Sequence, residues 1–190
     1  NIAVPTHEKV RVISPAKETF VNYFGNDSYI LDYSNLPYTF DTDISYPNNL
    51  NRSLDFFYNI ADEEEKWITS VDEYGYGLFQ CSTSELKGRK LFVWGQGKGG
   101  KNWNQFLSDG SNDGYIEIQS GLARTQLEHI PMSNGETWSW VEAYGAISCG
   151  ENAHGEWNVA VSRVQEEIAK HFENGINNTL FTFKNDVVVT

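Results

Sequence analysis

The stretch that decides the fold covers residues 114–145 and reads "GYIEIQSGLARTQLEHIPMSNGETWSWVEAYG". Its first part alternates between polar and apolar side chains. In an extended strand the polar set shares one face and the apolar set the other, namely Tyr115, Glu117 and Gln119 against Ile116 and Ile118. This alternation is typical of a strand with one buried and one polar face. The stretch therefore predicts β-structure.

Similar short segments, rich in aromatic and β-branched residues, fill most of the chain. We expect strands at residues 10–13, 29–33, 54–60, 67–71, 77–81, 90–94, 115–119, 125–130 and 137–144. Turns such as "DEYGYG" and "MSNGE" separate them, and there Gly can adopt positive φ. The spacing predicts a mainly β protein, an antiparallel β-sandwich or barrel.

One C-terminal segment has a helical period instead. Apolar residues recur there at helical spacing, at Val161, Val164, Ile168 and Phe172, and Asn174-Gly175 follows as a stop signal. We expect one amphipathic helix over residues 157–172. The chain would then divide into a β domain at 1–150 and a helix with a linker toward a following region at 151–190.

The composition limits the classes of partner. The 190 residues suit one domain, and the net charge of −12 would repel nucleic acid and anionic membranes. No apolar run reaches the roughly 20 residues that span a bilayer, and no signal segment opens the chain. We therefore expect a soluble, cytoplasmic domain without a nucleic-acid or membrane partner. Its two cysteines predict buried or idle thiols, with a disulfide as the alternative.

The glycine-rich stretch "FVWGQGKGGKNWNQFL" at residues 92–107 imitates a phosphate loop. It contains both G-x-G-x-x-G and G-x-x-x-x-G-K. A phosphate loop leads into a long helix, but residues 102–107 allow only about two helical turns, and Asn102 replaces the magnesium-binding Ser or Thr. We interpret the glycines as a surface loop surrounded by Trp94, Gln96 and Trp103.

Metal motifs are incomplete. Residues 109–114 begin like a calcium loop, but Ser120 stands where a bidentate Glu is required. The four histidines are scattered, without a zinc-binding spacing. We expect no metal and no cofactor.

Polar chemistry concentrates in the stretch quoted first. If segments 125–130 and 137–144 flank strand 115–119, then carboxylates, amides, a guanidinium and indoles converge on one concave face, from Glu117, Gln119, Arg124, Gln126, Glu128, Trp138, Trp140 and Glu142. Sugars select such surfaces, because polar groups bind hydroxyls and aromatic faces cover the C–H side of a ring. The alternative is a solvated face without a task, with both indoles in the core. Glu117 is the stronger candidate, because a carboxylate in an apolar strand needs partners or a purpose.

These residues resemble the galactose mutarotase-like superfamily of β-supersandwich domains. "EIQ" at residues 117–119 matches the E-x-Q strand of aldose epimerases, and "NGETW" at 134–138 is similar to their P-G-E-x-W/Y turn. "RKLFVWGQGKGGKNWNQFL", "YIEIQSGLARTQLEH" and "ETWSWVEAYG" look like a bacterial family of uncharacterised mutarotase-like domains that often precede tetratricopeptide repeats. This likeness runs from Asn1 to about Gly155.

The resemblance implies that the chain is a partial supersandwich domain. It also implies that Glu117 is a general base on an anomeric hydroxyl, with the general acid upstream of Asn1. We therefore expect a carbohydrate site with Glu117 as the catalytic candidate, Gln119, Arg124 and Glu128 as binding residues, and Trp94, Gln96 and Trp103 at the rim. Any activity would be that of an aldose epimerase or another carbohydrate-active enzyme. The alternative is a non-catalytic module that binds a protein partner through the adjoining helical region.

Overall fold

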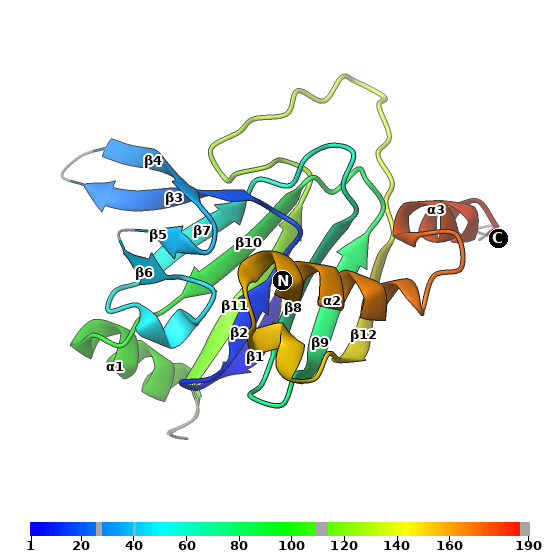
Figure 1. Cartoon of the computed structure of the whole chain (residues 1–190). Helices are drawn as coiled ribbons and strands as arrows, with labels where there is room; N and C mark the ends of the chain where they lie inside the picture. Colours follow the sequence, from blue (N-terminus) through cyan, green and yellow to red (C-terminus); the bar gives the residue numbers. More distant parts are fainter. Residues whose placement is uncertain (26–27, 40, 109–113, 187–190) are drawn as a thin grey trace.

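The chain folds into two large antiparallel sheets and one two-stranded sheet, and the two C-terminal helices pack against the four-stranded sheet (Figure 1). A computed structural model describes residues 1–25, 28–39, 41–108 and 114–186. The predicted class is confirmed, because the domain is mainly antiparallel β and carries a helix near its C-terminus. Three α-helices occur in the described residues rather than one, at Lys98–Leu107 (α1), Trp157–Ala169 (α2) and Ile176–Asp186 (α3).

The first sheet has six strands in the order β1-β11-β10-β7-β3-β4. Their bounds are Ile2–Thr6 (β1), Gly114–Gly121 (β11), Gly88–Val93 (β10), Leu54–Tyr58 (β7), Glu18–Gly25 (β3) and Ser28–Asn35 (β4). The predicted strands at 29–33, 54–60, 90–94 and 115–119 fall within or overlap these elements.

The second sheet has four strands in the order β12-β9-β8-β2. Their bounds are Glu142–Ser148 (β12), Tyr76–Ser82 (β9), Lys66–Val71 (β8) and Arg11–Ile13 (β2). The remaining elements are short, at Tyr38–Thr39 (β5), Thr42–Asp43 (β6), Pro47–Asn49 (η1) and Glu151–His154 (η2).

The molecule has three layers and two cores. One core lies between the sheets, where Ile116, Ile118 and Leu91 of the first sheet pack with Val12 and Ile68 of the second. The other lies between the second sheet and the helices, and it contains Trp67, Phe79, Val164 and Ile168 among others. In Figure 1, α2 runs across the second sheet and α3 lies beside its β12 edge. The face of the first sheet that points away from the second sheet, called the outer face below, carries the candidate site.

The helical period predicted at 157–172 is confirmed in α2. Val164 and Ile168 are fully buried against the sheet, whereas Val159 on the opposite side is exposed. Trp157 donates its indole N–H to the Ala16 carbonyl at 3.0 Å, which fixes the start of the helix. The buried stripe of α2 is therefore part of this domain's own core.

The predicted strand at 125–130 does not form, and the one predicted at 137–144 begins later than expected. Residues 125–130 and 137–141 belong to a long loop, and β12 begins only at Glu142. The reason is that β11 is already paired along both edges, with β1 on one side and β10 on the other. Because no edge of β11 is free, the alternating pattern downstream has no strand to pair with, and β12 pairs with β9 in the second sheet instead.

The glycine stretch contains a helix that the sequence interpretation did not predict. α1 begins directly after Gly97 and spans 10 residues. Packing explains it: Trp103 of α1 stacks on Trp94 with 6.2 Å between ring centroids, and Asn104 Oδ1 accepts the Tyr115 backbone N–H at 3.2 Å. Tertiary contacts thus stabilise a segment of low helix propensity.

Candidate functional site

Strand β11 presents its polar side chains on the outer face of the first sheet, as the alternation predicts. Ile116 and Ile118 are 2% exposed and lie in the core, whereas Tyr115, Glu117 and Gln119 are half-buried on the other side. Glu117 lies across from Ala3 on one neighbouring strand and from Phe92 on the other.

The Glu117 carboxylate is held by neutral amide groups. Its Oε2 accepts the Gln119 Nε2–H at 3.2 Å and the Asn1 Nδ2–H at 3.0 Å. The two residues of the E-x-Q pattern therefore hydrogen-bond each other. No cation pairs with Glu117 among the described residues, so its carboxylate remains available as a hydrogen-bond or proton acceptor.

A buried ion pair lies beside Glu117 and Gln119 on the same face. Lys90, which is paired in register with Gln119, places its Nζ 2.7 Å from Asp55 Oδ1. The same Nζ donates to Gln126 Oε1 at 3.0 Å and lies over the Phe57 and Phe92 rings. The two side chains of the pair are only 11% and 9% exposed.

Sequence reasoning missed this pair. The available signal was charged residues within two otherwise apolar strands, Asp55 in "LDFFY" and Arg89 and Lys90 in "GRKLFV". A buried charge needs a partner, so two such residues of opposite sign in neighbouring strands form a candidate pair.

A cavity of ≈ 290 Å³ opens between the first sheet and the loop that follows β11. It brings together three of the predicted residues, Gln119, Arg124 and Glu128, and its wall also includes Lys90. The loop is tied by the Arg124 backbone N–H, which donates to Glu128 Oε2 at 3.0 Å. The Arg124 guanidinium reaches Asp62 Oδ1 at 2.8 Å, and this hydrogen bond lowers the pKa of the Asp62 carboxyl.

Aromatic rings occupy the other end of the outer face. Trp94 packs edge-on against Phe92 at 4.7 Å and against Tyr115 at 6.1 Å between ring centroids. Trp103 is 53% exposed on top of Trp94. The two predicted tryptophans therefore lie beside Tyr115 and Phe92, which flank Glu117.

The Gln96 side chain contacts η1 and does not line the cavity. Its Nε2 donates to Asn48 Oδ1 at 2.9 Å, and the same oxygen accepts the Thr6 hydroxyl at 3.1 Å. This contact ties the glycine loop to η1, and Gln96 contributes to the loop structure rather than to the cavity.

Two backbone amides of the glycine stretch already donate to carbonyls within the domain, and a helix follows them. The Gln96 N–H donates to the Leu50 carbonyl at 2.7 Å, and the Gly97 N–H to the Asn51 carbonyl at 2.9 Å. A phosphate loop requires such N–H groups to point at the anion. The expected absence of a helix is wrong, but the bonded amides of Gln96 and Gly97 support the interpretation of a structural loop.

The predicted convergence of three adjacent strands is wrong, although Glu142 still contacts β11 from the second sheet. Glu142 lies in the second sheet, where its Oε2 accepts hydrogen bonds from Ser120 Oγ at 2.8 Å, Tyr144 OH at 2.7 Å and Gln80 Nε2 at 3.0 Å. Burial alone would raise the pKa of Glu142, but these hydrogen bonds outweigh it and lower the pKa. Burial and Glu142 together raise the pKa of Tyr144 to about 12. Glu142 therefore connects the two sheets.

The two indoles of the loop do not belong to the core, contrary to the alternative considered from sequence. Trp140 is 42% exposed, and Trp138 donates its indole N–H to Glu136 Oε1 at 2.7 Å. Both cysteines are buried free thiols. Burial raises the pKa of Cys81 to about 12 and that of Cys149 to about 11.

The described residues show neither a metal cluster nor a helix suited to crossing a membrane. Within them, His, Cys, Asp and Glu side chains do not gather in groups of three or more that could hold a metal ion. The calcium-like start at Asp109, Ser111 and Asp113 lies outside the described residues. Of the helices in the described ranges, none has the length and apolar character needed to cross a membrane.

Comparison with known proteins gives two matches. The solved structure of a TPR-domain containing protein from Parabacteroides distasonis is similar over 76% of this chain, with a TM-score of 0.55 and 19% identity. The chain spans 23% of that protein's length, and the likeness concerns the fold. Among curated proteins, none matches the sequence. A family described as "Domain of unknown function (DUF5107)" matches residues 18–137, which is more than half of the chain, and the chain therefore belongs to this family.

Proposed function

We propose that this domain binds carbohydrate on the outer face of the six-stranded sheet. The observation that carries the proposal is the adjacency of Glu117 and Gln119 between aromatic rings and a cavity of ≈ 290 Å³. Carboxylate and amide groups bind sugar hydroxyls, and the exposed indole of Trp103 offers a flat face for a pyranose ring. The resemblance to mutarotase-like domains favours the same ligand class.

The test is a ligand-observed NMR screen of monosaccharides and short glucans. We expect Glu117→Ala and Trp103→Ala to lose the saturation-transfer signal of a binding sugar. The matched controls are Glu64→Ala and Trp140→Ala, which alter an exposed Glu and an exposed Trp that do not line the cavity. If the controls lose as much signal as the site variants, the site lies elsewhere. If no sugar binds to the full-length protein, the proposal is wrong.

Catalysis is a sharper version of the same proposal. Anomeric interconversion requires proton removal from the anomeric hydroxyl and proton donation to the ring oxygen. Glu117 would serve as the base, since amides rather than a cation hold its carboxylate. Lys90 is a charged donor on the same face.

Exchange NMR of the α and β anomers, measured on the full-length protein, separates a catalyst from a binding module. We expect Glu117→Gln to lower kcat while KM stays within about threefold, because the amide retains the shape but cannot take a proton. Binding without faster interconversion would identify a binding module. Unchanged turnover in Glu117→Gln would reject the role of Glu117.

A protein-interaction module is the second candidate. The observation that favours it is α3, which exposes Phe181 and Phe183 by 49% and 59%. The similar solved structure is that of a TPR-domain containing protein, and this likeness supports a protein-interaction context. Partner binding would then depend on α3, since the apolar stripe of α2 is buried within the domain. Phe181→Ser with Phe183→Ser should abolish such binding and leave sugar binding intact, and the opposite result would contradict this candidate.

A further inference from the structure

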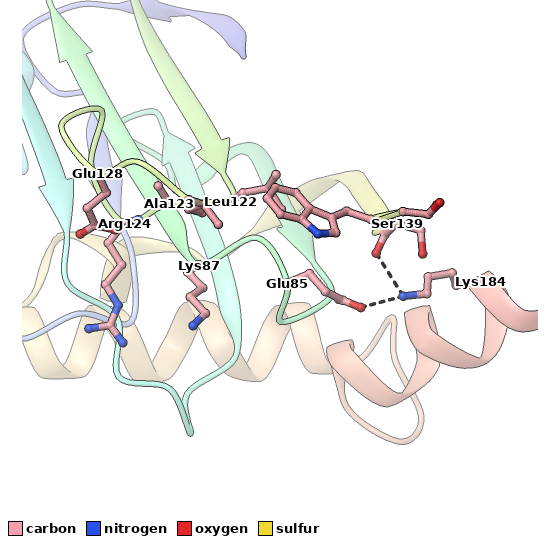
Figure 2. A pocket seen from close by; sticks show the side chains of 11 residues that line it. Glu85, Lys87, Leu122, Ala123, Arg124, Glu128, Ser139 and Lys184 are labelled. Atoms are coloured by element: carbon pink, nitrogen blue, oxygen red, sulfur yellow. Dashed lines mark hydrogen bonds and ion pairs between the residues drawn. The ribbon is translucent and has the colours of Figure 1, made fainter. Parts of the chain in front are cut away.

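A second, larger cavity of ≈ 660 Å³ adjoins the first. It lies between the loop after β11, the turn that carries Glu85 and Lys87, and Lys184 of α3 (Figure 2). The two cavities share part of their walls, including Arg124 and Glu128. A ligand with two units could therefore place one unit in each.

Three cations line this larger cavity in a chain that is strongly acidic overall. The protein has 14 Lys and Arg against 26 Asp and Glu, yet Lys87, Arg124 and Lys184 meet here. In Figure 2, Lys87 lies between Arg124 and Glu85. Such a concentration of positive charge attracts an anion more strongly than the rest of the surface does.

Each of these three cations can still donate hydrogen bonds to a ligand. The described residues include no hydrogen-bond or ion-pair partner for the Lys87 ammonium. Arg124 Nη2 pairs with Asp62, whose side chain is 67% exposed. An ion pair this exposed is weak, so a ligand anion can replace Asp62 at little cost in free energy. Lys184 donates to Glu85 Oε1 at 2.6 Å and to the Ser139 carbonyl at 3.1 Å, which leaves one of its three N–H donors.

One oxygen of each carboxylate in the cavity already accepts a hydrogen bond. Glu85 accepts from Lys184, and Glu128 accepts the Arg124 backbone N–H. Burial alone would raise the pKa of Glu85, but hydrogen bonds from Lys184 and Thr83 outweigh it and lower the pKa, so Glu85 stays ionised. The rest of the wall contains the apolar Leu122 and Ile130 and the aromatic Trp138, together with Thr137 and Ser139.

We propose that the larger cavity receives an acidic sugar unit, whose anionic group contacts Lys87 and Arg124 while its ring lies against the wall with Trp138. Guanidinium and ammonium groups bind carboxylate and phosphate through charge-assisted hydrogen bonds. The adjacent unit of the same glycan would lie in the smaller cavity beside Gln119. This inference rests on the proposed carbohydrate function and specifies the class of carbohydrate.

The test compares each acidic sugar with its neutral parent. Calorimetry on the full-length protein measures Kd for cellobiose against cellobiouronate and for glucose against glucose 6-phosphate. The two pairs distinguish a carboxylate from a phosphate. We expect one acidic member to bind about tenfold more tightly than its neutral partner, which corresponds to one charge-assisted contact. The preference should shrink between 20 mM and 500 mM salt, because screening weakens it.

Substitutions locate the effect. Lys87→Met should remove most of the acidic preference and leave the Kd of the neutral sugar unchanged. Lys98→Met, which alters an exposed lysine on α1, should change neither. Equal binding of acidic and neutral members, or a preference unaffected by Lys87→Met, would overturn this inference and leave the sugar site standing. Binding of neither member would contradict the proposed function and the inference together.

Discussion

Lys90 Nζ lies 2.7 Å from Asp55 Oδ1 on the outer face of the first sheet, and both side chains are almost fully buried. Two oppositely charged groups thus share a low-dielectric site beside Glu117. A buried charge that loses its partner is expensive, whereas the pair as a whole can be replaced at little cost.

The first prediction concerns this ion pair. Lys90→Met should lower the free energy of unfolding by about 3 kcal/mol, because it leaves the Asp55 carboxylate buried without a cation. Adding Asp55→Leu should restore most of the loss. Urea denaturation measures both. The comparison is Arg124→Met, which breaks an exposed ion pair and should cost at most about 1 kcal/mol; a cost equal to that of Lys90→Met would contradict the argument.

The second prediction uses adjacent glycines in α1. A Cβ at Gly100 would lie 2.2 Å from the carbonyl oxygens of Gly95 and Trp94, whereas a Cβ at Gly99 meets nothing within 4 Å. Gly100→Ala should displace α1 and cost about 2 kcal/mol through overpacking. Gly99→Ala should stabilise by up to about 1 kcal/mol, since Ala favours the helix.

Tryptophan spectra report the same displacement. The stacked Trp94 and Trp103 rings should separate in Gly100→Ala, with a changed near-ultraviolet circular dichroism signal, and remain unchanged in Gly99→Ala. Identical behaviour of the two variants would show that the close approach of α1 to the glycine loop is absent in solution.

The third prediction tests whether α2 belongs to the domain core. Val164→Ala removes two buried methyl groups and should cost about 2 kcal/mol, including the cavity that remains. Val159→Ala makes the same chemical change where the side chain is 52% exposed, and the effect should stay within about 0.5 kcal/mol. Thermal unfolding of the two variants measures this difference. If Val164→Ala does not lower the stability, then α2 does not pack on the sheet.

The fourth prediction concerns pH. Because the folded-state pKa of Glu142 is lowered, its hydrogen bonds stabilise the protein above the ordinary Glu pKa of about 4.3, and this contribution is lost as the pH falls through the folded-state value. Glu142→Gln should therefore be less stable than the wild type at pH 7. Its Tm should also fall less on acidification.

Tm measured at pH 7 and at pH 3.5 checks this linkage. Glu64→Gln, in an exposed turn, serves as the control and should follow the wild type at both pH values. If Glu142→Gln loses as much stability on acidification as the wild type, then the hydrogen bonds to Ser120, Tyr144 and Gln80 do not favour the ionised form.

Local patterns were enough to predict several features of the chain. The period of two in β11 correctly divides Ile116 and Ile118 from Glu117 and Gln119, and the helical period around Val164 and Ile168 correctly predicts α2. Both succeed because burial on one face requires apolar side chains at a fixed period, whatever the neighbouring elements are.

The composition of the site depends on pairings between distant segments. Lys90 and Asp55 meet only because β10 and β7 are neighbours, and α1 forms because Trp103 has Trp94 to stack on. The segment after β11 carries a strand-like pattern but remains a loop, since β1 and β10 already occupy both edges of that strand. The sequence by itself thus determined which face of each regular element is apolar, because that depends on local periodicity. Only the tertiary structure decided which polar side chains share a cavity, because strand order and edge occupancy are set by contacts far apart in the chain.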